Sequence, residues 1–496
     1  TVFMAKELVP YLQKGVPKED LVAGLALSVA QNYLNRVVKK RPIGETVFFQ
    51  GGTAYNDAVA AAFATLLDKT VIVPPHNGIM GAIGAALLAR DSMDAGKPTS
   101  FRGWRMDNVP HSLREFDCGT CSNRCVVQEF TVAGEKSHWG DKCSDRYRRR
   151  AKTKKKALIM DLVRFREESM EALLKTVPPQ NPDMGTVGIP MALFFHDRLP
   201  FWRKYLETLG FGLAFSERTS PEVAAAGVEA CANEPCFPVQ AAHGHMVNLM
   251  QKGTDWLFFP NVVDEEDTIK SVASFLCPWV QTFPLVAAQG RTLEAVRTKI
   301  ACPRVLFREG KEAVERRLFK WAARWGVSSD RHRKAVGNAY EAQENFRRCI
   351  QEKGIETLKV LVNKNAPAVV LAGRPYNLYD SGMNLNVPRK LSGLYGQNVV
   401  PMDFLPIDDI DVRPVNDHMF WNYGRRILQA ARFVRDLPDF QLIYISNFKC
   451  GPDSYVRHYV EEAAEKPFLF LQMDGHSNDA GMMTRIEAFL ESKGML

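Results

Sequence analysis

The chain lacks any long uninterrupted run of apolar residues. None approaches the roughly 20 residues that a membrane-spanning helix requires, so the sequence predicts a protein with no membrane partner. We expect no secretory segment, and the 496 residues include only 10 cysteines, which excludes a small disulfide scaffold and favours the reducing cytoplasm. A start methionine is also missing, because the chain opens at Thr1, and we expect a fragment of a longer protein.

An excess of charge of one sign is confined to one short segment. The net charge is +8, and the basic run RYRRRAKTKKK covers residues 146–156. The rest of the chain is nearly balanced, so we interpret this run as a solvated linker or helix start and predict no nucleic-acid partner. Coenzyme A phosphates or an acidic protein are the alternatives for the run. The chain length predicts several domains of ordinary globular composition.

The most informative feature that is present is a group of four closely spaced cysteines. They are Cys118, Cys121, Cys125 and Cys143. Thiolates this close in sequence can converge on one ion or one cluster. A zinc ribbon usually shows two C-x-x-C pairs, and here the second pair is missing. The spacing therefore favours an iron–sulfur cluster, with zinc as the alternative and a pair of structural disulfides as a third interpretation.

Three more cysteines stand beside proline or glycine at the predicted ends of strands or helices. They are Cys236, Cys277 and Cys450. Doubly wound α/β domains place functional residues at such turns. Three converging thiolates can hold one cluster and leave one iron open to a substrate. Taken by itself, a cysteine is more often simply a small buried hydrophobic residue.

Two histidines and one arginine are candidate catalytic residues. His243 and His245 are two residues apart on a predicted helix, so they point to different faces and do not form one metal site. Either can donate a hydrogen bond or move a proton, and a structural role is the alternative. Arg374 ends a predicted strand, where a guanidinium can meet a carboxylate or phosphate or form a plain loop salt bridge.

The pattern of apolar residues predicts an α/β fold in five parts. A buried strand ends in Gly51 and Gly52, a position where backbone can approach a nucleotide closely. The prolines of PPQNPDMG mark a later boundary. The predicted parts are a partial nucleotide-binding domain (1–92), a cysteine-rich metal or cluster connector with a helix (93–183), a first doubly wound, flavodoxin- or Rossmann-like lobe (184–326), a helical connector (327–364) and a second such lobe (365–496).

Within the first lobe, the sequence predicts specific elements. We expect a strand over TVGIPMALFF at 186–195, and helices over 201–209, 221–231 and 239–251.

The first part of the chain resembles a known ATPase. Its order of strand, GG-x-x-x-N, alanine-rich helix, VP strand and GxxGAxGAAL helix is similar to the C-terminal half of the actin-like ATPase domain of 2-hydroxyacyl-CoA dehydratase activators. The resemblance implies that Gly51, Gly52 and Asn56 lie against the adenosine of ATP or ADP in the complete protein. The phosphate-binding loops of that family lie upstream and have no match in this sequence.

The strings EPCFPVQAAHGH, CPWVQ, GRPYN and CGPDS resemble the dehydratase component of the same enzymes, in the large form fused behind activator ATPase domains. The resemblance spans residues 186–475. It implies that Cys236, Cys277 and Cys450 bind a four-iron, four-sulfur (4Fe-4S) cluster. Some relatives hold a double-cubane cluster instead, and Cys231, Cys302 and Cys349 are then available as further ligands.

Together these features predict an ATP-linked iron–sulfur electron-transfer protein of anaerobic metabolism, a reductive activase. Its expected partners are a low-potential electron donor and an acyl-CoA dehydratase-type acceptor, and a homodimer is expected by analogy. Two alternatives stay open. One is a 2-hydroxyacyl-CoA dehydratase that binds the thioester carbonyl at the open iron, and the other is a scaffold module with zinc at the first four cysteines and no redox chemistry.

Overall fold

The computed structural model describes most of the chain as helices, strands and loops of mixed α/β type, which confirms the predicted class. No helix in the described part of the chain is long and apolar enough to cross a membrane. The chain divides into two compact units, Thr1–Asn108 and Val109–Leu496. The structure describes residues 10–38, 41–93, 101, 104–105, 109–119, 125–141, 156–180, 184–231, 233–268, 272–475 and 479–496.

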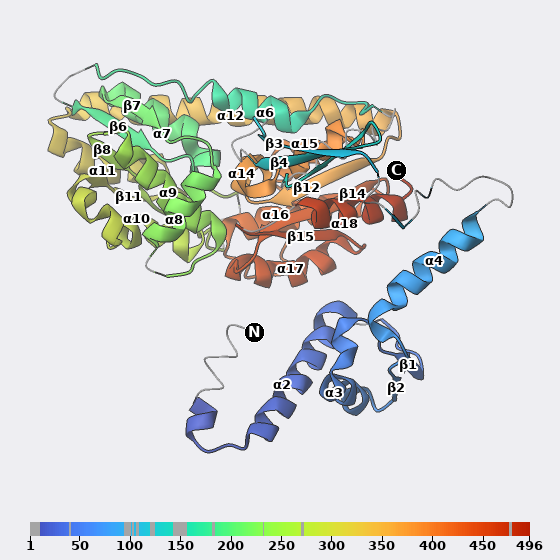
Figure 1. The fold of residues 1–496 in the computed structure, drawn as a ribbon. Helices are drawn as coiled ribbons and strands as arrows, with labels where there is room; N and C mark the ends of the chain where they lie inside the picture. Colours follow the sequence, from blue (N-terminus) through green and yellow to red (C-terminus); the bar gives the residue numbers. More distant parts are fainter. Residues whose placement is uncertain are drawn as a thin grey trace. The chain divides into compact units, whose positions relative to one another are not determined.

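The first unit contains a short parallel strand pair and three main helices (Figure 1). Strands β1 (Thr46–Phe48) and β2 (Thr70–Ile72) pair with Thr46 opposite Thr70. A small core forms where α2 and α3 pack together, because alanines allow the two helices to approach closely. The helical elements are α2 (Lys18–Tyr33), the π-helix η1 (Leu34–Val38), the 3₁₀ helices η2 (Gly52–Tyr55) and η3 (Asn77–Ile79), α3 (Asp57–Leu67) and α4 (Met80–Ser92).

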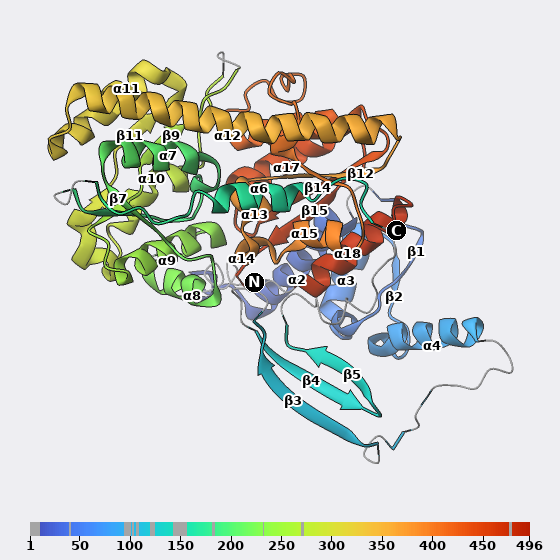
Figure 2. The same ribbon diagram turned by 90° about the horizontal axis from the view of Figure 1, so that it is seen from above.

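The second unit begins with a three-stranded antiparallel sheet (Figure 2). Its strands are β3 (His111–Asp117), β4 (Val126–Val132) and β5 (Glu135–Trp139), in that order. A tight turn joins β4 to β5 at Ala133 and Gly134, which both have positive φ.

The second unit contains a first parallel sheet of order β10-β8-β6-β7, which with the helices around it we call the first lobe. Pro260 and Pro303 interrupt β8 and β10, and the same pair continues beyond them as β9 and β11. The strands are β6 (Thr186–Ile189), β7 (Gly212–Phe215), β8 (Trp256–Phe258), β9 (Asn261–Asp264), β10 (Ile300–Ala301) and β11 (Arg304–Leu306). The helical elements are α7 (Phe195–Leu209), α8 (Pro221–Ala230), α9 (Phe237–Gln251), α10 (Pro278–Ala287), η7 (Arg291–Lys299), η8 (Phe307–Glu309), α11 (Lys311–Ala322) and η9 (Ala323–Trp325).

The predicted strand at 186–195 is too long. The strand ends at Ile189, because Pro190 has no N–H to donate to a neighbouring strand. The residues after it turn into α7, which begins at Phe195, six residues before the predicted helix start. The other two helices agree with prediction to within two residues.

A second parallel sheet follows in the same unit, of order β13-β12-β14-β15, and with its helices we call it the second lobe. All residues of β12 and β14 are buried, as expected for strands covered on both faces. The strands are β12 (Ala368–Gly373), β13 (Val399–Pro401), β14 (Phe440–Asn447) and β15 (Leu469–Met473). The helical elements are α13 (Pro375–Tyr379), α14 (Ser381–Asn384), α15 (Val387–Gly393), η10 (Met402–Phe404), α16 (Asn422–Arg435), α17 (Gly451–Ala464) and α18 (Asp479–Ser492).

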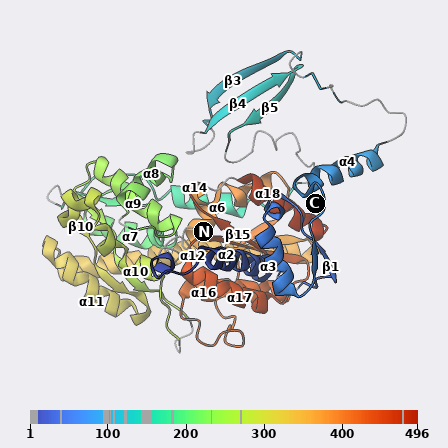
Figure 3. The same ribbon diagram turned by 60° about the horizontal axis from the view of Figure 1, so that its bottom comes forward.

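Both lobes therefore place their strands in the order second, first, third, fourth along the chain. This is the order of a flavodoxin-like doubly wound sheet, in which ligands bind beyond the carboxyl ends of the strands. Figure 3 shows the two groups of helices that cover the sheets, with α7, α8 and α9 in one lobe and α16, α17 and α18 in the other.

Two helices tie the lobes together. The long helix α12 (Ser329–Asn363) runs along both lobes, packing on α7 of the first and on η10 of the second (Figure 2). Helix α6 (Leu162–Glu171) inserts Leu162 and Val163 into the core of the second lobe and Met170 into the core of the first.

Helices α8 and α9 touch through two glycines. A Cβ at Gly244 would lie 1.8 Å from the carbonyl oxygen of Val223, and one at Gly227 would lie 2.1 Å from that of Gln240. We therefore expect Gly244→Ala to destabilise the protein by roughly 1–3 kcal/mol, because the backbones must separate. Urea unfolding monitored by circular dichroism measures the effect.

The matched control is Gly337→Ala in the middle of α12, where an added Cβ meets nothing within 4 Å. That change should stabilise the protein by up to about 1 kcal/mol, because alanine favours a helix. Equal effects of the two substitutions would contradict the close-packing argument.

Candidate functional site

Three helices of the two lobes begin at a cysteine. Cys236 is the N-cap residue of α9, Cys277 of α10 and Cys450 of α17, and each helix has a proline in its first turn. Cys277 and Cys450 also occupy equivalent places, because each follows the third strand of its sheet. All three side chains are buried, and none is in a disulfide.

The three thiols lie near one another. Burial raises the pKa of Cys236 to about 11, and the neighbouring Cys277 adds to the effect. Burial, followed by Asp453, also raises the pKa of Cys450, and Cys236 contributes. In the described part of the chain, no three His, Cys, Asp or Glu side chains are close enough to hold a single metal ion. The cysteines thus share one environment without forming a mononuclear metal site.

A buried ion pair lies beside these cysteines. Arg374, the N-cap of α13, donates from Nε and Nη2 to Asp453 Oδ1 at 3.0 and 2.8 Å. Ser446 donates to the other carboxylate oxygen at 2.6 Å. Burial is the largest single effect and disfavours the guanidinium charge, but Asp453, Tyr376 and the two cysteines Cys450 and Cys277 together outweigh it and raise the pKa of Arg374. The arginine predicted to bind an anion is therefore already paired.

The loop that carries Cys277 is held by the other lobe. The N–H of Phe275 donates to the carbonyl of Phe420 at 2.8 Å, and the N–H of Asn422 donates to the carbonyl of Phe275 at 3.0 Å. Asn422 Nδ2 also donates to Ser274 Oγ at 2.9 Å. Asn422 was not among the residues predicted from sequence. Its place in the site depends on the packing of two distant segments, and no local sequence signal marks it.

The two candidate histidines are fully buried and hydrogen-bonded. His243 Nδ1 lies 2.9 Å from the carbonyl oxygen of Val239 and 3.3 Å from Cys231 Sγ. His245 bridges Ser216 and Thr219, at 2.8 Å through Nδ1 and 3.0 Å through Nε2. Burial, followed by the nearby His196, lowers the pKa of His245 to about 3. At neutral pH His245 is therefore uncharged.

This lowered pKa predicts acid sensitivity. The unfolded chain binds a proton at His245 below its ordinary pKa of 6.5, whereas the folded chain does not until about pH 3. Stability should therefore fall as pH decreases from about 6.5 towards 3, by at most about 1.4 kcal/mol per pH unit from this residue. Urea midpoints at pH 7 and pH 5 measure the loss, and His245→Gln should reduce it.

The control is His418→Gln, because the side chain of His418 is 87% exposed. That variant should keep the pH dependence of the original protein. An unchanged dependence in His245→Gln would show that His245 does not stay neutral on folding.

Only part of the four-cysteine group lies in the described residues. The N–H of Cys118 donates to the carbonyl of Cys125 at 2.8 Å, so the two cysteines face each other where β3 and β4 begin to pair. Cys121 and Cys143 lie outside the described residues. The convergence of all four remains a prediction.

The predicted nucleotide contacts lie at the end of β1. Gly51 has φ of +99°, a conformation that disfavours a side chain, and its N–H donates to the carbonyl of Asn77 at 2.8 Å. Asn77 Nδ2 returns a bond to the Gly51 carbonyl at 3.2 Å. Gly52 begins η2, and Asn56 caps α3 by accepting from the N–H groups of Ala58 and Val59. The sequence analysis did not predict Asn77, although an asparagine directly before Gly78 was a possible signal.

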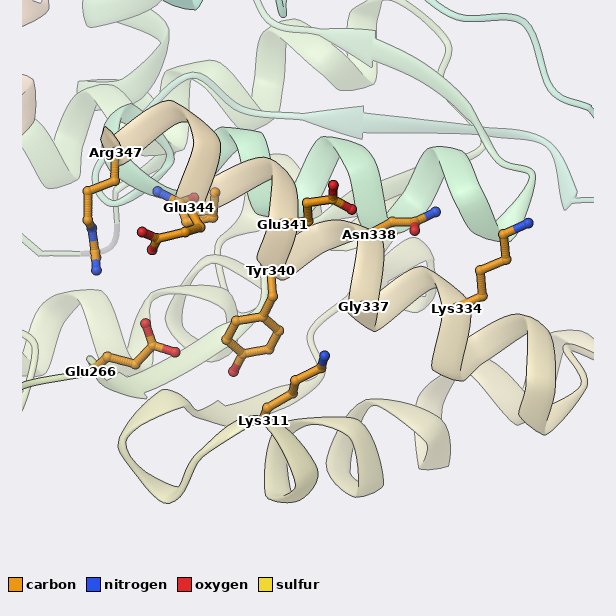
Figure 4. Close-up of a pocket in the computed structure, with 10 residues that line it drawn as sticks. Glu266, Lys311, Lys334, Gly337, Asn338, Tyr340, Glu341, Glu344 and Arg347 are labelled. Atoms are coloured by element: carbon orange, nitrogen blue, oxygen red, sulfur yellow. The ribbon is translucent and has the colours of Figure 1, made fainter. Parts of the chain in front are cut away.

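A wide pocket lies between α12 and the first lobe, which contributes Glu266 and Lys311 to its lining (Figure 4). Its volume is about 650 Å³. Lys311 and Glu266 extend towards Tyr340, whereas Lys334 and Glu341 point away from it (Figure 4). Three basic side chains in the lining match three carboxylates, so the pocket favours neither sign of charge.

The second unit combines parallel α/β sheets with a group of buried cysteines at helix starts. Two parallel sheets of flavodoxin-like strand order bring three buried cysteines to the N-cap positions of helices, where the helix dipole favours negative charge. Such an arrangement suits thiolates or an anionic group that they bind. The first unit adds a glycine turn at a strand end of the kind that lies against nucleotides.

Comparison with known proteins supports the family that the motifs resemble. Residues 186–405 match the model of the CoA enzyme activase uncharacterised domain, DUF2229, and residues 1–89 match the BadF/BadG/BcrA/BcrD ATPase family. Together these matches support a relationship to the activators of 2-hydroxyacyl-CoA dehydratases. The ATPase match agrees with the predicted assignment of the first part of the chain.

Named relatives match the first part of the chain. The 2-hydroxyisocaproyl-CoA dehydratase activator of Clostridioides difficile is 36% identical over 91 residues, and the activator of lactoyl-CoA dehydratase of Anaerotignum propionicum is 35% identical over 92. The (R)-2-hydroxyglutaryl-CoA dehydratase activating ATPase of Acidaminococcus fermentans is 35% identical over 89. Each match covers 18% of this chain and about a third (34–35%) of the relative.

Proposed function

We propose that this chain is part of an ATP-linked iron–sulfur electron-transfer protein that activates an acyl-CoA dehydratase-type acceptor. The observation that carries the proposal is the gathering of Cys236, Cys277 and Cys450 at three helix N-termini of the two lobes. The family matches support the activating role and the use of ATP.

The three cysteines fit an iron–sulfur cluster better than a single ion. In a cluster each thiolate binds a different iron, so the sulfurs need not approach as closely as the ligands of one ion. The absence of a mononuclear site among the described residues is consistent with this arrangement. A bound cluster would supply one-electron transfer at low potential, and three protein ligands would leave one iron open.

The surrounding residues can tune such a centre. The N-termini of α9, α10 and α17 direct backbone N–H groups towards the thiolates and stabilise negative charge. Arg374 adds a buried positive charge that Asp453 largely compensates. Burial of the thiols excludes water. Arg374, His243 and His245 act in this proposal as groups that position the site or move protons near it.

The remaining assignments follow the same proposal. Gly51, Gly52 and Asn56 would lie against the adenosine of ATP or ADP in the complete protein, and a low-potential donor would supply electrons. Cys118, Cys121, Cys125 and Cys143 would hold a second cluster that relays electrons, or zinc. Pairing of two chains, as proposed for the complete protein, would bring two ATPase modules to one acceptor.

The deciding experiment is anaerobic purification followed by measurement of iron, sulfide and zinc per chain with the visible spectrum. We expect a brown protein with about four or more irons. A colourless protein with one zinc would support the scaffold alternative instead. Binding of a 2-hydroxyacyl-CoA ester to the reduced protein, with turnover to the dehydrated ester, would favour the dehydratase alternative.

A further inference from the structure

A second, smaller cavity lies where α6 meets both lobes. Its volume is about 190 Å³. Residues that follow β6, β7 and β12 line it, so it lies beyond the carboxyl ends of strands from both sheets, where α/β proteins bind ligands. The lining includes Met170 of α6, Leu174 just after this helix, and His196, Thr219 and Asp380 from the lobes.

A directional chain of hydrogen bonds runs behind this cavity. Thr219 donates to Asp380 Oδ2 at 2.6 Å, so Thr219 Oγ1 accepts from His245 Nε2–H at 3.0 Å. Nδ1 of the neutral His245 ring is then an acceptor, and the Ser216 hydroxyl donates to it at 2.8 Å. The N–H of Met191 donates to Ser216 Oγ at 2.8 Å. The chain thus ends on a carboxylate that only accepts.

A buried histidine, His196, lies near the Asp380 carboxylate. His196 is 8% exposed, and its Nε2 has no hydrogen-bond partner. Nε2 of this ring lies 3.7 Å from Asp380 Oδ2, which is too far for a hydrogen bond. Burial, which lowers the pKa of His196, keeps the ring neutral.

The charges at the rim of the cavity are matched. Arg218 from the first lobe pairs with Glu171 of α6. Arg389 from the second lobe pairs with Glu167 of α6 at 3.5 Å. Because each arginine already has a carboxylate, the rim offers no net charge to an ionic ligand. The small volume and the Met170 and Leu174 walls favour a compact, partly apolar molecule.

We propose that this cavity binds a small uncharged organic molecule that carries a hydroxyl group. The ligand hydroxyl donates its proton to Asp380 Oδ2 and its oxygen accepts from His196 Nε2–H, and the carbon skeleton lies against α6. The ligand contacts α6 and both lobes together. The inference does not depend on an iron–sulfur cluster or on ATP.

The test uses propane-1,2-diol as the probe and 1,2-dimethoxyethane as a matched molecule without a hydroxyl donor. Calorimetric titration of the full chain should show binding of the diol only. His196→Phe should weaken diol binding by about tenfold, because one hydrogen bond to the ligand is lost. Met170→Leu, a change of similar volume in the same wall, should leave the affinity within about twofold.

Three results would overturn the proposal. They are no diol binding to the original protein, equal binding of the ether, or full affinity in His196→Phe. If that variant does not fold, a crystal structure of the unaltered chain at saturating diol gives the answer. Density for the diol between His196 and Asp380 supports the site, and a lone water there overturns it.

Discussion

Replacing any one of Cys236, Cys277 or Cys450 with alanine is expected to remove nearly all the cluster iron that these residues hold. Each is the N-cap of a different helix, and no other described cysteine occupies such a position. A four-iron cluster with only two protein ligands should be lost during purification. Iron and sulfide analysis of each anaerobically purified variant, with the visible spectrum, measures the loss.

Cys349→Ala is the control, because Cys349 is exposed on α12. For a single four-iron cluster the control keeps its iron, whereas parallel losses in Cys231→Ala, Cys302→Ala and Cys349→Ala would indicate a double-cubane cluster. Iron that survives in all three N-cap variants would show that the gathered cysteines are not its ligands. Some iron can remain in an N-cap variant. If a second substitution at Cys118 then removes it, that iron is bound by the group of Cys118, Cys121, Cys125 and Cys143.

Removing Arg374 should have the largest effect on stability. Arg374→Met leaves Asp453, 1% exposed, with a buried charge and one remaining side-chain donor, Ser446. Breaking a buried ion pair in this way is expected to cost about 3–5 kcal/mol. Urea unfolding of the anaerobically purified variant measures the cost.

A double substitution separates the effect of breaking the ion pair from the effect of the altered side-chain volume. Arg374→Met with Asp453→Leu removes both charges and should recover part of the stability, because no buried charge is then left unpaired. The matched surface control is Arg413→Met, since Arg413 and Asp411 form an exposed pair. That control should change little. An equally small effect of Arg374→Met would show that the buried carboxylate finds another partner.

Local patterns predicted much of the secondary structure. The helices at 221–231 and 239–251 were found to within two residues, because proline starts and apolar periodicity are local signals. The strand at 186–195 was extended too far, since an apolar run does not show where its hydrogen bonds end. Pro190 was the missed signal.

The candidate site was only partly predictable. Proline or glycine beside each cysteine indicated Cys236, Cys277 and Cys450, because these residues mark helix starts at the ends of strands. Asn422 and Asp453 were not predicted, although one holds the Cys277 loop and the other pairs with Arg374. Their partners lie 79 or more positions away in sequence, so no local pattern connects them.

The sequence by itself determined the α/β class, the family resemblance and the cysteines that begin helices, because periodicity, turn residues and motif spacing are properties of neighbouring residues. Tertiary structure alone decided the buried Arg374–Asp453 pair and the placing of His196 Nε2 at 3.7 Å from Asp380 Oδ2. Each depends on strands that are distant in sequence and that end at the same edge of a sheet or at the junction of two sheets. Burial there fixes which groups are charged and which lack a partner.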